Sequence, residues 1–345
     1  MTQHWWKDFH DRDDRWLGLA LHAAASPSAA TTLEMRSGHH GRMALYLQDE
    51  PLFWATTLLD HSGVWLVFNA DHKHQHNLLP PITSQDIEHL CRKAPHDRER
   101  EWCRYFARRL TDTGHPLLPG QRCLLRPMLP AKHTAAHANS PVQAITDWRF
   151  QSPDSRGNLA FNWRLYGEDF PDLRQPEYVT FVDWWFGGDQ LLPRYAIEPD
   201  SGRLKWWRKK CREGTLPPIL VWHVAGLASF VILDGHYRLQ AAIEEQIAPQ
   251  FVVLSELSER VIAPTAAHEA KITQALEAQL RKNPHGKIDG INQTLIDLYD
   301  TRYHYASTHS RAVLGNGDAW ARQVSTYLRH HQADALLDKI LARLE

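Results

Sequence analysis

The residues Asp234 to Arg238, Asp-Gly-His-Tyr-Arg, combine side chains and backbone that suit phosphate chemistry. Gly235 has no Cβ and could let a ligand approach the backbone closely. His236 and Arg238 supply hydrogen-bond donors, and Asp234 could orient one of them or hold a metal-bound water. These residue types predict an active or ligand-binding site for an anion. The alternative is an ordinary turn, in which Asp234 caps a helix and Arg238 pairs with Glu244 or a neighbouring acid.

A strand and a helix are predicted to position this turn. Residues 229–233 form an unbroken β-prone run, Ser-Phe-Val-Ile-Leu, that leads directly into Asp-Gly. The apolar residues that follow recur at helical spacing: Leu239, Ala242, Ile243 and Ile247. The first N–H groups of a helix have no partner within it, and the helix dipole favours an anion there. The N–H groups of His236, Tyr237 and Arg238 would therefore point to one phosphate site.

Residues 194–254, about sixty of the 345, resemble the ParB/sulfiredoxin-like fold in the order of their parts. An entry segment with a proline, Ile-Glu-Pro at 197–199, precedes the predicted helix RLKWWRKKCREG at 203–214. The segments LPPILVWHV at 216–224, SFVILDGHYRLQAAI at 229–243 and FVVL at 251–254 follow in the order typical of that fold. The specific motif of the resemblance is the D-G-H-x-R core.

The branches of this superfamily imply different functions. Sulfiredoxins carry a cysteine at the position matching Gly235-His236, which is absent here, and chromosome-partitioning ParB proteins bind CTP through a G-E-R-R-like turn. The turn of this chain looks most like that of ATP- or ADP-dependent free-serine kinases and of ParB-like nucleases and NTPases. By that resemblance Gly235, His236 and Arg238 would hold nucleotide phosphates, and Glu198 or Asp200 would act as general base.

The resemblance therefore implies a phosphotransferase or NTPase that uses ATP or another nucleoside triphosphate with Mg²⁺. Gly235 and the amides of His236 and Tyr237 would cradle the phosphate, and Arg238 would stabilise its equatorial charge. Glu198 would take a proton. The catalytic set so predicted is Asp234, His236, Arg238 and Glu198.

A basic segment adds local charge to the predicted site. Six cationic residues and no acid lie between positions 203 and 212: Arg203, Lys205, Arg208, Lys209, Lys210 and Arg212. Such a surface attracts phosphate. If the superfamily arrangement holds, the segment lies near the turn, and Lys205 or Arg208 could neutralise a nucleotide. The alternative is an exposed basic face with one of two adjacent tryptophans, at 206 and 207, in the core.

The whole chain has no basic field of its own. Lys and Arg number 39 against 40 Asp and Glu, a net charge of −1, which disfavours non-specific nucleic-acid binding. A ParB-like DNA-binding protein or nuclease is therefore the third hypothesis. The four cysteines lack C-x-x-C spacing and are expected to be reduced thiols. The charged, aromatic N-terminal segment has no long apolar run, so we expect a cytoplasmic protein without a membrane partner.

The predicted fold class is α+β: a ParB/sulfiredoxin-like core with a helical C-terminal extension and a separate N-terminal α+β domain. The boundaries are 1–129 for the N-terminal domain, 130–144 for a polar linker, 145–263 for the core domain with aromatic strands, and 264–345 for the helical region. Within 1–129 we expect a helix up to about residue 25, a meander of strands at 41–48, 51–59 and 63–70, a helix capped by Thr83, another from Pro95, and a strand at 120–128.

Two further patterns leave a binding function open. His72, His74 and His76 alternate, so they would share one face of an extended strand and could bind zinc or nickel; a solvated loop is the favoured alternative. Of the adjacent Trp184 and Trp185 one must face away from the core and could contact a ligand or partner. A non-enzymatic protein-binding module, of an immunity, antitoxin-like or regulatory kind, is the second hypothesis for the chain.

Overall fold

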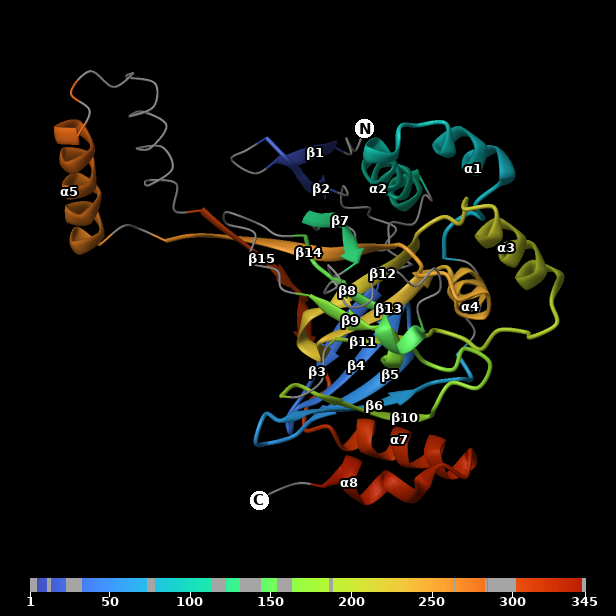
Figure 1. The fold of residues 1–345 in the computed structure, drawn as a ribbon. Helices are drawn as coiled ribbons and strands as arrows, with labels where there is room; N and C mark the ends of the chain where they lie inside the picture. Colours follow the sequence, from blue (N-terminus) through green and yellow to red (C-terminus); the bar gives the residue numbers. More distant parts are fainter. Residues whose placement is uncertain are drawn as a thin grey trace.

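The chain folds as a mixed α+β protein, as the sequence predicts, and its described strands form two sheets (Figure 1). The computed structural model describes residues 5–10, 14–22, 33–72, 78–112, 122–130, 144–153, 163–185, 189–262, 265–282, 284 and 302–342. Every structural statement below concerns these residues. The predicted linker lies almost wholly outside them.

The larger sheet carries the candidate site. Its strand order is β1 (Trp5–His10), β2 (Trp16–His22), β7 (Arg122–Pro130), β14 (Phe251–Val261), β12 (Ile219–Val224), β13 (Ser229–Asp234) and β11 (Gln190–Leu192). Three more strands join it, with β15 (Arg302–Ser307) paired to β14, β8 (Arg149–Gln151) paired to β7, and β9 (Arg164–Tyr166) paired to β8. The β12–β14 and β11–β13 pairs are parallel, whereas β12 and β13 are antiparallel.

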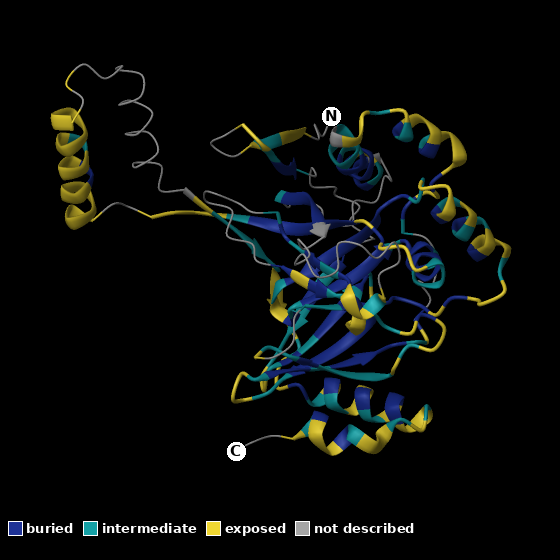
Figure 2. Cartoon of the chain, viewed as in Figure 1, coloured by how far each residue is buried: buried dark blue, intermediate teal, exposed yellow. Residues whose placement is uncertain are grey.

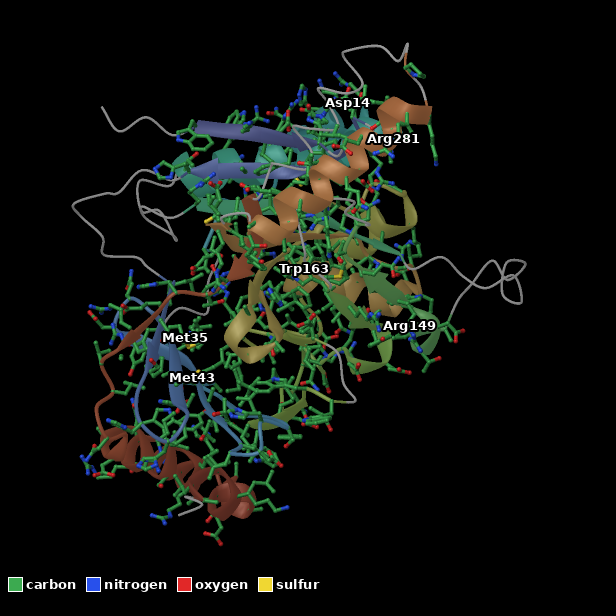
Figure 3. All side chains as sticks on the ribbon, turned by 90° about the vertical axis from the view of Figure 1, so that its left-hand side faces the viewer. Asp14, Met35, Met43, Arg149, Trp163 and Arg281 are labelled. Carbon is green, nitrogen blue, oxygen red and sulfur yellow. The ribbon has the colours of Figure 1, made fainter. Side chains whose placement is uncertain are left out.

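The strands at the centre of this sheet are buried on both faces, which explains why they lack polar alternation. Trp222 and Val231 pack into a core that also contains Phe53 and Leu66 of the smaller sheet. On the opposite face, alternate residues of the same strands join Trp148, Phe150 and Trp163 in a second core. Figure 2 shows these strands as buried along nearly their whole length, and Figure 3 places Trp163 beside them.

The smaller sheet has the order β10 (Val179–Asp183), β6 (Gly63–Phe68), β5 (Glu50–Thr57), β4 (Arg42–Leu47), β3 (Leu33–Ser37) and β16 (Ser310–Ala312). The predicted meander is confirmed as β4, β5 and β6. One face packs toward the larger sheet, and α7 (Asp318–His330) and α8 (Leu337–Leu341) cover the other (Figure 1). Trp54 and Val67 meet Trp320 and Val324 across that contact.

The remaining helices are α1 (Ser84–Cys91), α2 (Pro95–Asp112), α3 (Gly202–Arg212), α4 (His236–Glu245) and α5 (Ala266–Lys282). Short 3₁₀ segments cover Ile145–Asp147, Gly167–Asp169, Ala225–Leu227 and Asp334–Leu336. The predicted cap of α1 is confirmed: Thr83 Oγ1 accepts the Asp86 N–H at 3.2 Å, and the Asp86 carboxylate accepts the Thr83 N–H at 2.8 Å. The cysteines are free thiols, and no described helix has the length and apolarity to cross a membrane.

Two secondary-structure predictions are wrong. The expected N-terminal helix is the antiparallel pair β1 and β2, because pairing of β2 with β7 buries the run Leu17 to Leu21 on both faces. The C-terminal region is not wholly helical, because β15 pairs with β14 and β16 pairs in parallel with β3. At the N-terminus a distant strand overrides a helical spacing of apolar residues, and at the C-terminus β15 and β16 interrupt the expected run of helices.

Strands from both sides of the predicted linker share each sheet. In the larger sheet β2 and β7 precede it and β14 follows it; in the smaller sheet β3 to β6 precede it and β10 and β16 follow it. The boundary expected at 130–144 therefore does not separate one sheet from another, and residues 1–129 do not form a sheet of their own.

Candidate functional site at residues 234 to 238

The strand, turn and helix predicted at this site are present. Strand β13 ends at Asp234, Gly235 is the N-cap with a φ of 120°, and α4 begins at His236. A Cβ on Gly235 would lie 3.0 Å from the Arg238 guanidinium and 3.1 Å from Ile219 Cγ2. Glycine is therefore required by its backbone conformation and by the approach of Arg238. The close neighbour that it admits is a side chain of the protein itself.

Arg238 is directed into the protein, with 2 % of its surface exposed. Its Nη2 donates to the Asp234 carboxylate at 2.9 Å, to the Asp234 carbonyl at 3.2 Å and to the Pro218 carbonyl at 3.0 Å. The guanidinium carbon also lies 5.3 Å from the ring centroid of Trp207, within cation–π range. This arrangement matches the ordinary-turn alternative, although the acid that pairs with Arg238 is Asp234 rather than Glu244.

His236 is also buried, and it acts as a hydrogen-bond acceptor. Its Nε2 accepts the backbone N–H of Arg194 at 2.9 Å, and its ring stacks on Tyr195 with the centroids 3.9 Å apart. Burial, reinforced by the nearby Arg194 and Arg238 cations, holds the pKa of His236 well below its usual value. The imidazole is therefore neutral, with its proton on Nδ1.

Arg194 connects this histidine to a second one. Its carbonyl contacts Nε2 of the buried His72, while its Nε and Nη2 donate to the carbonyls of Ile232 and Leu233, both at 3.0 Å. Burial lowers the pKa of the Arg194 guanidinium to about 10. Sequence reasoning missed Arg194, because no local spacing relates it to partners 38 to 122 positions away.

The predicted histidine run is only partly described. His72 is buried against Arg194, whereas His74 and His76 lie outside the described residues. Among the described residues no group of three or more His, Cys, Asp or Glu side chains could hold a metal ion.

The outer side of the turn carries the exposed polar groups. The Tyr237 hydroxyl accepts the backbone N–H of Glu198 at 3.3 Å, and the Arg203 guanidinium carbon lies 5.0 Å from the Tyr237 ring centroid. Glu198, Asp200 and Arg203 are exposed, and Tyr237 is half-buried. The structure thus brings the predicted base, Glu198, next to the turn. Arg203, at the start of α3, is the cation beside it, a position that the sequence did not single out.

The other predicted cations of α3 face different partners. Arg208 pairs with Glu245 at 2.6 Å and with Glu244 at 3.1 Å, and Arg212 also pairs with Glu245 at 2.6 Å. Lys205 is exposed and forms no ion pair with the described residues. The acids at the end of α4 thus neutralise much of the basic face that was expected to attract phosphate.

The adjacent tryptophans face opposite ways, as predicted. Trp184 is half-buried against the core shared by the two sheets, whereas Trp185 is 70 % exposed. The Trp185 indole donates to the His61 carbonyl at 3.3 Å, and its backbone N–H donates to the Asp183 carboxylate at 2.7 Å. The described contacts therefore hold a large apolar side chain at the surface.

No protein-family model, no curated protein and no solved structure matches this chain. The resemblance to the ParB/sulfiredoxin-like superfamily accordingly stays a prediction that rests on the motif and on the order of its elements.

Proposed function

We propose that this chain is a non-enzymatic binding protein in which the turn Asp234 to Arg238 has a structural role. We call this turn the clasp, because its contacts hold β13, α4 and α3 together. The observation that carries the proposal is the burial of Arg238 on Asp234 and two carbonyl oxygens. A phosphate could take over Nη2 of this guanidinium only by breaking the buried pair with Asp234, and breaking a buried ion pair costs about 3–5 kcal/mol. His236 is likewise occupied by the N–H of Arg194.

The fold we infer for residues 194–254 is the ParB/sulfiredoxin-like core. The order of α3, β12, β13, α4 and β14 supports this inference. In such a core the clasp joins the end of β13 to α4, and through Trp207 to α3. An immunity, antitoxin-like or regulatory protein could retain the fold for that purpose, since a fold does not fix a reaction. Trp185 is exposed in this chain, and a protein partner that covered it would bury a large apolar side chain. Tryptophans buried in this way often contribute much of the binding energy of an interface, so Trp185 supports a protein partner.

A nucleotide-dependent phosphotransferase or NTPase is the second candidate, and one observation favours it. The Arg203 guanidinium and the backbone N–H of Glu198 both contact Tyr237, beside the start of a helix whose N-cap, Gly235, offers no side-chain cap. A phosphate there would meet Arg203 and the first N–H groups of α4, Mg²⁺ would bridge the phosphate oxygens, and Glu198 would be the base. No comparable observation favours the third hypothesis, a DNA-binding protein or nuclease.

A thermal-shift titration with ATP, ADP, CTP and GTP in the presence of Mg²⁺ separates the two candidates. A ligand that binds only the native state at a hundred times its Kd stabilises it by about 2.7 kcal/mol. The proteins compared are the wild type, Arg203→Gln, and Lys209→Gln as a matched control on the exposed side of α3. We expect no nucleotide to raise the Tm of any of them at millimolar concentration. A rise that Arg203→Gln loses and Lys209→Gln keeps would establish the second candidate instead.

A further inference from the structure

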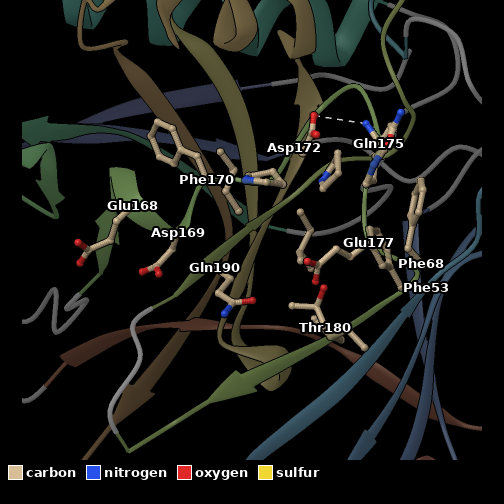
Figure 4. A pocket seen from close by; sticks show the side chains of 16 residues that line it. Phe53, Phe68, Glu168, Asp169, Phe170, Asp172, Gln175, Glu177, Thr180 and Gln190 are labelled. Atoms are coloured by element: carbon tan, nitrogen blue, oxygen red, sulfur yellow. Dashed lines mark hydrogen bonds between the residues drawn. The ribbon is translucent and has the colours of Figure 1, made fainter. Parts of the chain in front are cut away.

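A pocket of about 370 Å³ lies between the smaller sheet and the chain that leads into β11, and none of the turn residues 234–238 lines it (Figure 4). Its floor is apolar, with Phe53 of β5, Phe68 of β6 and Leu192 of β11 all buried. This size is within the range of small-molecule sites.

Acidic side chains line the mouth of this pocket. Glu168, Asp169, Asp172 and Glu177 are all exposed lining residues, and none of the lining residues is Lys, Arg or His. Figure 4 shows Glu168 and Asp169 on one side of the pocket and Glu177 on the other, nearer to Phe53 and Phe68. The pocket therefore combines negative potential with an apolar floor, which suits a cation that carries hydrocarbon and opposes a nucleotide.

Two of these acids are already engaged, and two are available. Glu168 lies 3.4 Å from Arg149, and Asp172 accepts the backbone N–H groups of Arg174 and Gln175 at 2.8 and 3.3 Å. The described residues provide no hydrogen bond or ion pair for Asp169 or Glu177.

Arg149 offsets part of this negative potential, because it pairs with Glu168 and favours the charged form of Asp169. Arg174, which adjoins the pocket, is turned to Glu244 at 2.5 Å. Burial and the neighbouring Glu168 raise the pKa of Asp169, and a positive ligand would relieve this repulsion.

We infer that this pocket binds an alkylammonium group, with the ammonium among the exposed carboxylates at the mouth and the hydrocarbon chain over the phenylalanines of the floor, Phe53 and Phe68. A bare metal ion fits less well, because the described residues include no group of three or more convergent metal-binding side chains. The ammonium could belong to a free diamine or to a lysine side chain of a protein partner. The inference rests on the pocket alone and does not depend on the function proposed for the turn.

Isothermal titration calorimetry tests the inference with 1,5-diaminopentane, with N-acetyl-lysine methylamide and with neutral 1-pentanol. We expect saturable binding of at least one of the two amines, weaker binding in higher salt, and no binding of the alcohol. Binding of the diamine alone assigns a free amine, whereas binding of the lysine derivative assigns a protein side chain.

The matched variants are the double variant Asp169→Asn with Glu177→Gln, and Asp338→Asn on the exposed side of α8 as control. The double variant should weaken amine binding by about tenfold or more, since hydrogen bonds to charged groups are of that strength. The control should bind like the wild type. The inference is overturned if neither amine binds at a ligand concentration of about 10 mM. It is also overturned if 1-pentanol binds as tightly as the amines, or if the double variant binds the amines as tightly as the control variant does.

Discussion

The backbone N–H of Arg194 donates a 2.9 Å hydrogen bond to Nε2 of the buried His236. The first residue of the motif-bearing segment is thereby fixed to the first residue of α4. Because the Arg194 carbonyl also contacts His72, the backbone of this one residue links the segment after β6 of the smaller sheet to helix α4 beside the larger sheet. The histidine that resembles a catalytic group thus holds two parts of the fold together.

The stability of the protein should fall in acid partly because of His236. Its pKa is about 6.5 in the unfolded chain and well below that in the fold. Above pH 6.5 the group is neutral in both states. Below it the unfolded chain binds a proton that the native state does not, so the free energy of unfolding decreases by up to about 1.4 kcal/mol per pH unit. Urea unfolding at pH 7.5 and 5.5 measures this loss.

The control for that measurement is a pair of variants. His236→Gln should show a smaller loss between the two pH values than the wild type, whereas His89→Gln, at an exposed position of α1, should lose as much as the wild type. An equal loss in His236→Gln and wild type would contradict the assignment of His236 as a neutral buried acceptor.

Arg238→Gln should destabilise the fold by about 3–5 kcal/mol, because it leaves Asp234 and the Pro218 carbonyl without their buried cation. Arg203→Gln removes an exposed cation and should change the free energy of unfolding by no more than about 0.5 kcal/mol. Guanidinium chloride unfolding of both variants gives the comparison. Were Arg238→Gln as stable as the wild type, the clasp would have no basis.

Gly235→Ala should cost about 1–3 kcal/mol, because a φ of 120° is strained for alanine and the new Cβ would crowd Arg238 and Ile219. Gly226→Ala is the matched control, since a Cβ there meets no atom within 4 Å. The measurement is the change in Tm of each variant relative to the wild type. A decrease in Gly235→Ala no larger than that in Gly226→Ala would refute the proposed packing.

Arg208→Gln should reduce stability only slightly, and far less than Arg238→Gln does, although it removes contacts to both Glu244 and Glu245. The Arg208 side chain is largely accessible to water, so solvent screens these ion pairs. The difference between variant and wild type should shrink further in 1 M salt, where the Debye length is about 3 Å. A loss as large as that expected for Arg238→Gln would show that the contact between α3 and α4 depends on these pairs.

The sequence predicted the parts of the site that depend on neighbours along the chain. The apolar run of β13, the glycine and the helical spacing of α4 are local, and so is the capping box of Thr83 and Asp86. The environment of the motif is not local. His236 meets Arg194 from 42 positions away, and Arg208 meets Glu245 from 37 positions away, so neither side chain's exposure could be inferred from spacing.

The same reason explains the error at the N-terminus. Leu17, Leu19 and Leu21 become strand residues because β7, about a hundred positions later, pairs beside them. A short apolar run of this kind is compatible with a buried helix and with a strand that is buried on both faces. Only pairing with the distant strand β7 determines which of the two forms. The acid-lined pocket was missed too, because its residues come from strands and loops of both sheets.

The position of β14 between β7 and β12 has a consequence for how the chain is made. During synthesis β1, β2 and β7 emerge more than 120 residues before the strand that completes their sheet, and β3 waits still longer for β16. A nascent chain of the first 130 residues therefore exposes an unpaired strand edge while it is still attached to the ribosome. Folding should be slow, and it should depend on protection of that edge until residue 261 has been added.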